Sequence, residues 1–197
     1  VYELIKGYNY LTVKGYQIGL IGPQDYDKDS LEINKARVNK GTYLENEQYR
    51  SVQNTLSSGS LIPKEAYLKV GGMDDDLFID AVDSEYCWRL RKNNYLVIKN
   101  NNAKLAHKLG EGNMKLLRFF NVGVSSPIRN YYQVRNVLLL ITRPYVPFYW
   151  KLTHFIKIFI KLVFYPIIQS NGLARFKYIS WGFIDGIRRV KGKYCHG

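Results

Sequence analysis

Residues 57–85 read SSGSLIPKEAYLKVGGMDDDLFIDAVDSE, and this stretch decides the fold. Its first residues are small, which predicts a strand over 57–62 whose backbone another group can approach closely. A short helix is predicted over 63–70, because proline is tolerated at a helix start and the glycine pair after it ends the helix. After an acidic loop, a second helix is predicted from Asp83 or Ser84 to about residue 93.

The acidic loop carries six carboxylates between residues 74 and 85. Apolar residues are interleaved with them, and solvated acidic runs rarely have such spacers. We therefore expect some of these carboxylates to lie over a pocket.

The flanking sequence predicts an α/β fold. A short apolar run at 17–21 ends at Gly22-Pro23 and predicts a buried strand. Two more strands are predicted at 95–99 and 103–107, and a helix at 1–11. From residue 127 the pattern becomes helical, with helices predicted at 128–142, 148–168 and 173–191.

Charge is distributed unevenly along the 197 residues. Residues 1–98 contain 12 Lys/Arg and 14 Asp/Glu, whereas residues 99–197 contain 17 and 2. A basic half of this kind favours an anionic partner, such as nucleic acid, anionic lipid or a phosphorylated ligand. Two cysteines are too few for a disulfide scaffold and indicate a reducing compartment.

Four segments together carry a family resemblance: SGSLI at 58–62, the helix ending VGGMD, LFIDAVDSEYCWRLRKNNY at 77–95 and AKLAH at 103–107. They resemble the second half of a family 2 glycosyltransferase of the GT-A fold, in the bacterial rhamnosyltransferase-like group. The resemblance implies that residues 1–125 are the acceptor-side, C-terminal part of a Rossmann-like GT-A catalytic domain. Residues 126–197 would then be a basic, amphipathic, membrane-associating helical extension.

This resemblance implies an inverting transfer of a sugar from a nucleotide diphosphate, in the synthesis of a cell-surface polysaccharide. Rhamnose from dTDP-rhamnose is the donor it suggests, with a saccharide or lipid-linked acceptor. Such a reaction needs a base for the acceptor hydroxyl and neutralisation of the departing diphosphate. Asp83 matches the family's catalytic aspartate, although a helix N-cap also explains its position. The cofactor implied is a divalent metal, Mg²⁺ or Mn²⁺.

Further site residues follow by position. His107 matches a histidine that joins the metal site, against the alternative of a structural histidine. Asp80 and Glu85 are predicted near the sugars, and stabilisation of a helix N-terminus is the alternative. Arg135, in RNYYQVRN at 129–136, would grip the diphosphate unless it is an exposed helix arginine. The last set is the small-residue segment that would border a sugar or simply pack in the core: Ser58, Gly59 and Ser60.

The metal-binding Asp-x-Asp motif of the family belongs before the strand that matches 17–21, and nothing there supplies it. The letters occur at 25–27, 27–29 and 74–76, but all follow the wrong element. We therefore expect the chain to be the C-terminal piece of a longer protein, which alone would hold a sugar nucleotide poorly.

The segment 148–168 is long enough to cross a bilayer by count, but its basic residues oppose spanning. Lys151, His154, Lys157 and Lys161 fall on one arc at helical spacing, with aromatic and branched residues on the remainder. This pattern predicts a helix that lies in the membrane interface, with packing against the domain as the alternative. We therefore expect a peripheral protein on the cytoplasmic, inner face of the cell membrane.

Two other functions compete with glycosyl transfer. The chain could be a non-catalytic module that binds anionic membrane surfaces through its basic helices. Nucleic-acid binding is disfavoured, because the basic residues lie beside long apolar faces and no recognition motif is present.

Overall fold

A computed structural model of the chain describes residues 1–29, 31–33, 41–107, 113–116, 120–123 and 125–195. The chain divides into two compact units. Unit 1 comprises Val1–Met73 with Asp83–Lys108, and unit 2 comprises Asp74–Val82 with Leu109–Gly197. Residues 74–82 of the acidic loop thus belong to unit 2, whereas Asp83 and Glu85 belong to unit 1. The boundary that we predict near residue 125 stays a prediction.

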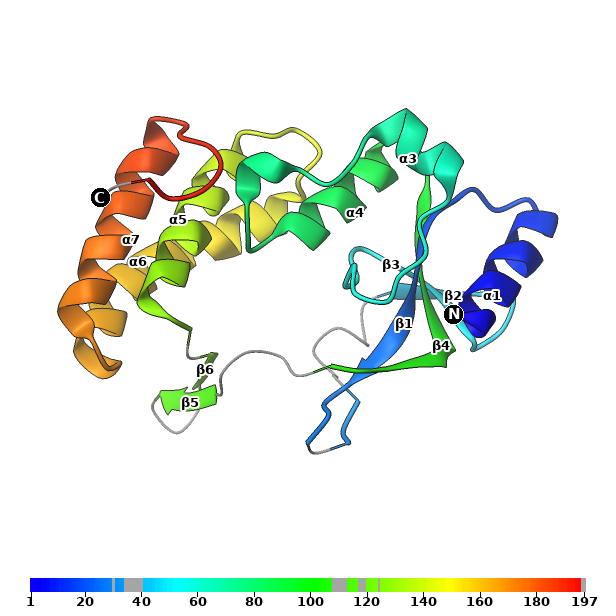
Figure 1. Ribbon diagram of the computed structural model, residues 1–197, viewed down its shortest axis with the longest axis horizontal. Helices are drawn as coiled ribbons and strands as arrows, with labels where there is room; N and C mark the ends of the chain where they lie inside the picture. Colours follow the sequence, from blue (N-terminus) through cyan, green and yellow to red (C-terminus); the bar gives the residue numbers. More distant parts are fainter. Residues whose placement is uncertain (30, 34–40, 108–112, 117–119, 124, 196–197) are drawn as a thin grey trace. The chain divides into compact units, whose positions relative to one another are not determined.

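Unit 1 is built on a mixed four-stranded sheet in the order β1-β4-β3-β2 (Figure 1). β1 and β4 are parallel, whereas the β4–β3 and β3–β2 pairs are antiparallel. The predicted α/β class, with a mixed sheet, is confirmed. The elements of this unit are α1 (Tyr2–Val13), β1 (Ile18–Tyr26), β2 (Gly41–Leu44), β3 (Tyr49–Val52), α3 (Lys64–Val70), α4 (Val82–Lys92) and β4 (Leu96–Ala106).

Helices cover both faces of this sheet. α1 packs on one face, where Leu4 and Leu11 meet Ile21 and Ile98. α3 and α4 pack on the other face, where Ala66, Tyr86 and Leu90 meet their strand neighbours Leu20 and Val97. The adjacent residues Leu20 and Ile21 of β1, and Val97 and Ile98 of β4, thus face opposite cores, as a pleated strand requires. The long apolar run in β1 is explained by burial on both faces.

Three sequence predictions about unit 1 are wrong in detail. Residues 57–60 form a turn, and only Leu61 pairs with a strand, through an isolated bridge to Ile21. Gly22-Pro23 does not end β1, which continues to Tyr26 beside β4. The two strands predicted over 95–107 are one strand, β4, whose register against β1 shifts between Pro23 and Gln24.

Unit 2 contains a short 3₁₀ turn and three long helices, and these helices begin and end within a few residues of the predicted bounds. A two-stranded antiparallel pair of β5 and β6 precedes them. The elements are η1 (Asp75–Leu77), β5 (Asn113–Leu116), β6 (Phe120–Gly123), α5 (Pro127–Ile141), α6 (Phe148–Ile168) and α7 (Gly172–Ile187).

Two glycines let α7 lie directly against α5. A Cβ atom added to Gly182 would lie 2.5 Å from the Tyr131 carbonyl oxygen, and one on Gly186 would lie 2.6 Å from Leu138 Cδ1. Both distances are below van der Waals contact, so the helices pack closely only because these positions lack side chains. Between them Asp185 accepts a 2.7 Å hydrogen bond from the Tyr131 hydroxyl. Burial and this bond raise the pKa of Tyr131 to about 12.

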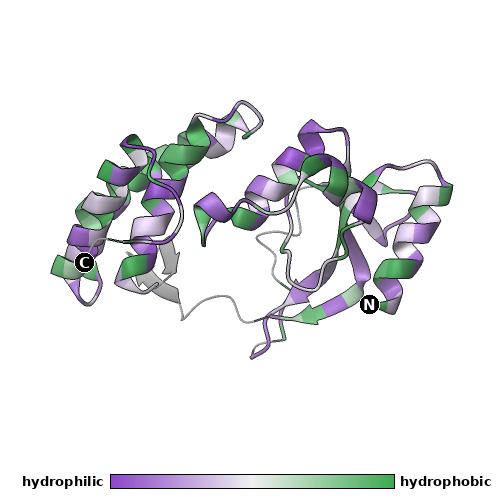
Figure 2. Ribbon diagram, turned by 45° about the horizontal axis from the view of Figure 1, so that its top comes forward, coloured by the Kyte–Doolittle hydropathy of each residue, from purple (hydrophilic) through white to green (hydrophobic). Residues whose placement is uncertain are grey.

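α6 half-buries Lys151, His154 and Lys161 of its basic arc, and exposes Lys157 together with most of its apolar arc. Lys161 donates a hydrogen bond to Gln133 of α5, and burial lowers the pKa of Lys161 to about 8. His154 stacks on Trp150, and burial, reinforced by Lys157, lowers the pKa of His154 to about 4. Figure 2 shows apolar bands recurring along the helices of unit 2. Within the described residues, no helix is sufficiently long and apolar to span a bilayer.

Candidate functional site

The parallel pair β1–β4 brings His107 to the carboxyl edge of the unit 1 sheet. Tyr26 and Ala106 are paired at the ends of the two strands, and the His107 amide donates a 2.9 Å hydrogen bond to the Tyr26 carbonyl. The ring atom Nδ1 of His107 is buried and has no hydrogen-bond partner among the described residues. Ligands of open α/β sheets bind outside this edge, so the position suits a functional histidine.

The turn at 57–60 lies beside the same end of the sheet. A Cβ atom on Gly22 would lie 2.7 Å from Ser60 Oγ, and one on Gly59 would lie 3.4 Å from Leu105. Ser60 Oγ donates to the Leu56 carbonyl, whereas Ser58 and Gly59 are exposed. Of the three small residues, Ser60 is therefore occupied in holding the turn, and Ser58 is the one whose hydroxyl faces solvent.

The segment before this turn contacts the N-terminus of α4, where Asp83 lies. Asn54 donates a 2.9 Å hydrogen bond to Ser84 Oγ, and the Cys87 thiol lies 3.8 Å from the Thr55 carbonyl. Residues 54–60 therefore run from the first turn of α4 to the carboxyl ends of β1 and β4. This segment contains Ser58 and contacts Ser84, which follows Asp83, and Leu105, two residues before His107.

Asp83 is the half-buried acid of its motif that has no basic partner among the described residues. Within the described residues its carboxylate makes no hydrogen bond or ion pair. The Asp75 carboxylate likewise makes none, but Asp75 is exposed. The remaining acids are paired, namely Asp74 with Arg143, Asp76 with Lys191, Asp80 with Arg129 and Glu85 with Arg89.

Glu85 is fully buried, and both of its oxygens are held by Arg89, at 2.8 and 3.0 Å. The same guanidinium donates to the carbonyls of Val70 and Gly72, at 2.7 Å each. Glu85 therefore ties α4 to the turn that ends α3. This contact explains why Glu85 is present without any role in binding a sugar. The predicted sugar-binding role of Glu85 stays a prediction.

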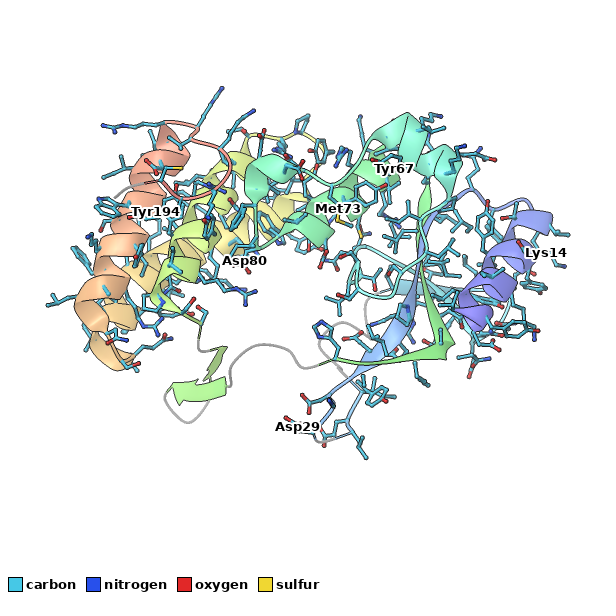
Figure 3. All side chains as sticks on the ribbon, viewed as in Figure 1. Lys14, Asp29, Tyr67, Met73, Asp80 and Tyr194 are labelled. Carbon is cyan, nitrogen blue, oxygen red and sulfur yellow. The ribbon has the colours of Figure 1, made fainter. Side chains whose placement is uncertain are left out.

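Asp80 and Arg135 both belong to unit 2. The Asp80 carboxylate is held in a bidentate pair by Arg129, with two contacts of 2.9 Å (Figure 3 labels Asp80). Arg135 is 0% exposed, and its guanidinium donates hydrogen bonds to the carbonyls of Asp76, Leu77 and Gly192. Arg135 is therefore not the exposed helix arginine of our alternative. A diphosphate would reach it only if the chain rearranged, and that predicted role remains untested.

The sequence Asp-x-Asp occurs at three places, and at each of them an ion pair or a local hydrogen bond explains the aspartates. Asp25 forms a buried ion pair of 2.6 Å with Lys99 across β1 and β4. Asp27 accepts a hydrogen bond from the Asp29 amide and so closes a local turn. Asp74 accepts one from the Asp76 amide and caps η1. Among the described residues, no group of three or more His, Cys, Asp or Glu side chains could hold a metal ion.

A sequence comparison identifies a known protein that is similar to this chain. The dTDP-rhamnosyl transferase RfbF of Shigella flexneri is 34% identical over 138 residues, which cover 70% of this chain and 46% of the relative. This chain is a relative of the rhamnosyltransferase-like glycosyltransferases. It spans about half the length of the relative that it matches. No family model matches the chain, and no solved structure matches it significantly.

In this chain, the sequence pattern alone did not identify the residues that hold the acidic loop. Arg129 and Asn136 lie in the same RNYYQVRN segment as Arg135, seven residues apart, and therefore on one face of α5. The unbroken acidic run at 74–76 and the basic second half were the available signal. The opposite charges could have suggested that the acidic loop pairs with the basic second half. The residues that contact one another, however, lie about fifty residues or more apart in the sequence.

Proposed function

We propose that the protein containing this chain transfers rhamnose from dTDP-rhamnose to a saccharide or lipid-linked acceptor, with inversion at the anomeric carbon. The chain would form the acceptor-side part of a GT-A catalytic domain. The observation that carries the proposal is Asp83, a half-buried carboxylate without a basic partner in the motif that resembles the family's base motif. Its relative is named as a dTDP-rhamnosyl transferase, which supports the donor.

In the proposed reaction Asp83 accepts the proton of the acceptor hydroxyl. The hydroxyl oxygen bonds to the anomeric carbon of rhamnose from the face opposite the diphosphate. The bond from that carbon to the diphosphate oxygen breaks, and dTDP leaves. A carboxylate without an arginine partner is suited to this step, because its oxygens remain available to a substrate hydroxyl.

A divalent metal, Mg²⁺ or Mn²⁺, would neutralise the diphosphate when bound. His107 would supply one ligand, since its buried Nδ1 lacks a partner within the described part of the chain. A full ligand set would require residues beyond those described, because no three-ligand group is present among them.

The donor is tested by incubating the complete natural protein with dTDP-rhamnose, an acceptor extract and Mg²⁺, and by measuring release of dTDP. We expect acceptor-dependent release with dTDP-rhamnose that exceeds release with UDP-glucose or GDP-mannose by at least tenfold. A clear preference for one of the other donors would exclude rhamnosyl transfer. Absence of acceptor-dependent release with every donor would exclude the transferase proposal.

A second proposal concerns location: the chain binds an anionic membrane surface at the inner face of the cell membrane. α6 is about 30 Å long at ~1.5 Å per residue. Exposed Lys157, Lys177 and Arg188 accompany its apolar face and that of α7, as expected for an interfacial helix. The exposed apolar side chains of α6 are Phe148, Tyr149, Leu152, Phe155, Ile156, Phe159, Ile160, Val163, Phe164, Ile167 and Ile168.

Membrane binding is tested by flotation with phosphatidylglycerol-containing vesicles. Replacing Leu152, Ile156 and Val163 by Glu places three charges at the centre of the exposed face, and we expect the bound fraction to fall at least tenfold. The matched control puts three glutamates at exposed apolar positions on helices of unit 1: Ile5, Val13 and Leu68. Equal binding by both variants would refute this face as the membrane contact. Self-association of the parent without vesicle binding would instead identify a protein interface.

A further inference from the structure

The segment that leads into Asp83 contains a strained backbone. Phe78 has φ 60° and ψ −68°, and the Ile79 amide donates a 2.7 Å hydrogen bond to the Leu77 carbonyl. These features define a γ-turn of the rarer, positive-φ form, which is strained for a residue with a side chain. Asp80 and Ala81 also have positive φ, each 64°. Such conformations persist only where the surroundings enforce them, and they cluster at functional sites.

Two buried side chains of α5 enforce this conformation. The Asn136 side-chain amide donates to three carbonyls of the loop backbone, those of Leu77, Ile79 and Asp80, at 2.6 to 3.0 Å. Arg135 donates to the Leu77 carbonyl at 2.9 Å and also to the Asn136 side-chain oxygen at 2.8 Å. That second bond fixes the orientation of the Asn136 amide, because the oxygen faces the guanidinium and the nitrogen faces the loop.

Other contacts from the same unit support the loop around these two residues. The ring of Phe78 packs on Tyr132 of α5, with the ring centroids 5.1 Å apart. Arg129 holds the Asp80 side chain, as described above. Arg135 and Asn136, however, are the side chains that contact the strained backbone itself. They are 0% and 1% exposed, so their hydrogen bonds do not compete with solvent.

We propose that Arg135 and Asn136 are positioning residues that hold the 77–81 backbone in its strained form for glycosyl transfer. The loop ends at Val82, immediately before Asp83 in the chain, so its conformation fixes the peptide from which the predicted base follows. The inference rests on the proposed function for its activity readout. The loop conformation itself can be measured without a substrate.

The test uses Asn136→Ala in the complete natural protein, with Asn130→Ala as the matched control. Asn130 is an equally buried asparagine of α5, and its side chain accepts a hydrogen bond from Ser125 instead of contacting the loop. We expect Asn136→Ala to accelerate amide hydrogen exchange in a peptide covering 76–82 at least tenfold, without a change in β1 and β4. We expect kcat to fall 10- to 100-fold with KM for the donor nearly unchanged, since misplacement of a catalytic group affects the chemical step.

A second substitution separates positioning from general loss of stability. Ala81→Gly allows positive φ without a steric penalty, so it should restore part of the kcat of Asn136→Ala. Unchanged exchange at 76–82 in Asn136→Ala would overturn the proposal, whatever the donor is. Faster exchange with full activity would also overturn it. Failure of the unmodified protein to transfer sugar would count against the proposed function, while the exchange result would still decide whether these residues hold the loop.

Discussion

Asp83→Asn is expected to lower kcat of the complete protein by about 100- to 10,000-fold, the usual contribution of a general base. The amide keeps the size and shape of the carboxylate but cannot accept the acceptor proton. Because Asp83 has no ion-pair partner within the described residues, its replacement breaks no salt bridge there. We therefore expect the melting temperature and the KM for the donor to stay close to those of the parent. Rates of dTDP release and thermal unfolding check both expectations.

Asp75→Asn is the control for this substitution. Asp75 is an exposed acid of the same loop and forms no ion pair with the described residues, so the change should leave kcat within twofold of the parent. If Asp83→Asn retained normal turnover, Asp83 would not be the base. A large loss of activity in Asp75→Asn as well would mean that the net charge of the loop matters more than one carboxylate.

Lys99→Met is expected to reduce the free energy of unfolding of unit 1 by about 3–5 kcal/mol. Lys99 and Asp25 are each 2% exposed and 2.6 Å apart, so removal of the lysine leaves a buried carboxylate without its ion pair. Urea unfolding of the complete protein, followed by exchange of β1 and β4 amides, measures the loss. Lys104→Met, on an exposed position of the same strand, should cost less than about 0.5 kcal/mol.

The double variant Asp25→Asn with Lys99→Met gives this prediction its decisive comparison. Because it removes both charges, it should recover part of the stability that Lys99→Met loses. A double variant less stable than Lys99→Met would show that the carboxylate is held mainly by groups other than the lysine.

The helices were the most predictable part of the fold. The bounds of α6 agree with the sequence because Pro147 precedes it and an apolar pattern continues through 21 residues. Strand limits were less predictable, because burial on both faces removes the alternation that marks a strand. β1 therefore ran past Gly22-Pro23, and the small residues at 57–60 proved to form a turn.

The candidate site could be proposed from the sequence where a motif is local. The resemblance suggests Asp83 and His107, and their roles stay predictions. The roles of Asp80 and Arg135 could not be read in the same way, since their partners are distant in sequence. An acid that looks reactive in the sequence can be neutralised by an arginine 49 residues later, as Asp80 is by Arg129.

The pairing of the acidic loop with α5 also has a consequence for protein synthesis. Asn136 is translated 59 residues after Leu77, the first carbonyl that it binds. At 5–20 residues per second, the loop emerges roughly 3–12 s before its partner helix exists. During that interval its strained backbone has nothing to hold it. The newly made loop must therefore adopt a relaxed shape first, and reach its final one only after the ribosome has delivered the later helix.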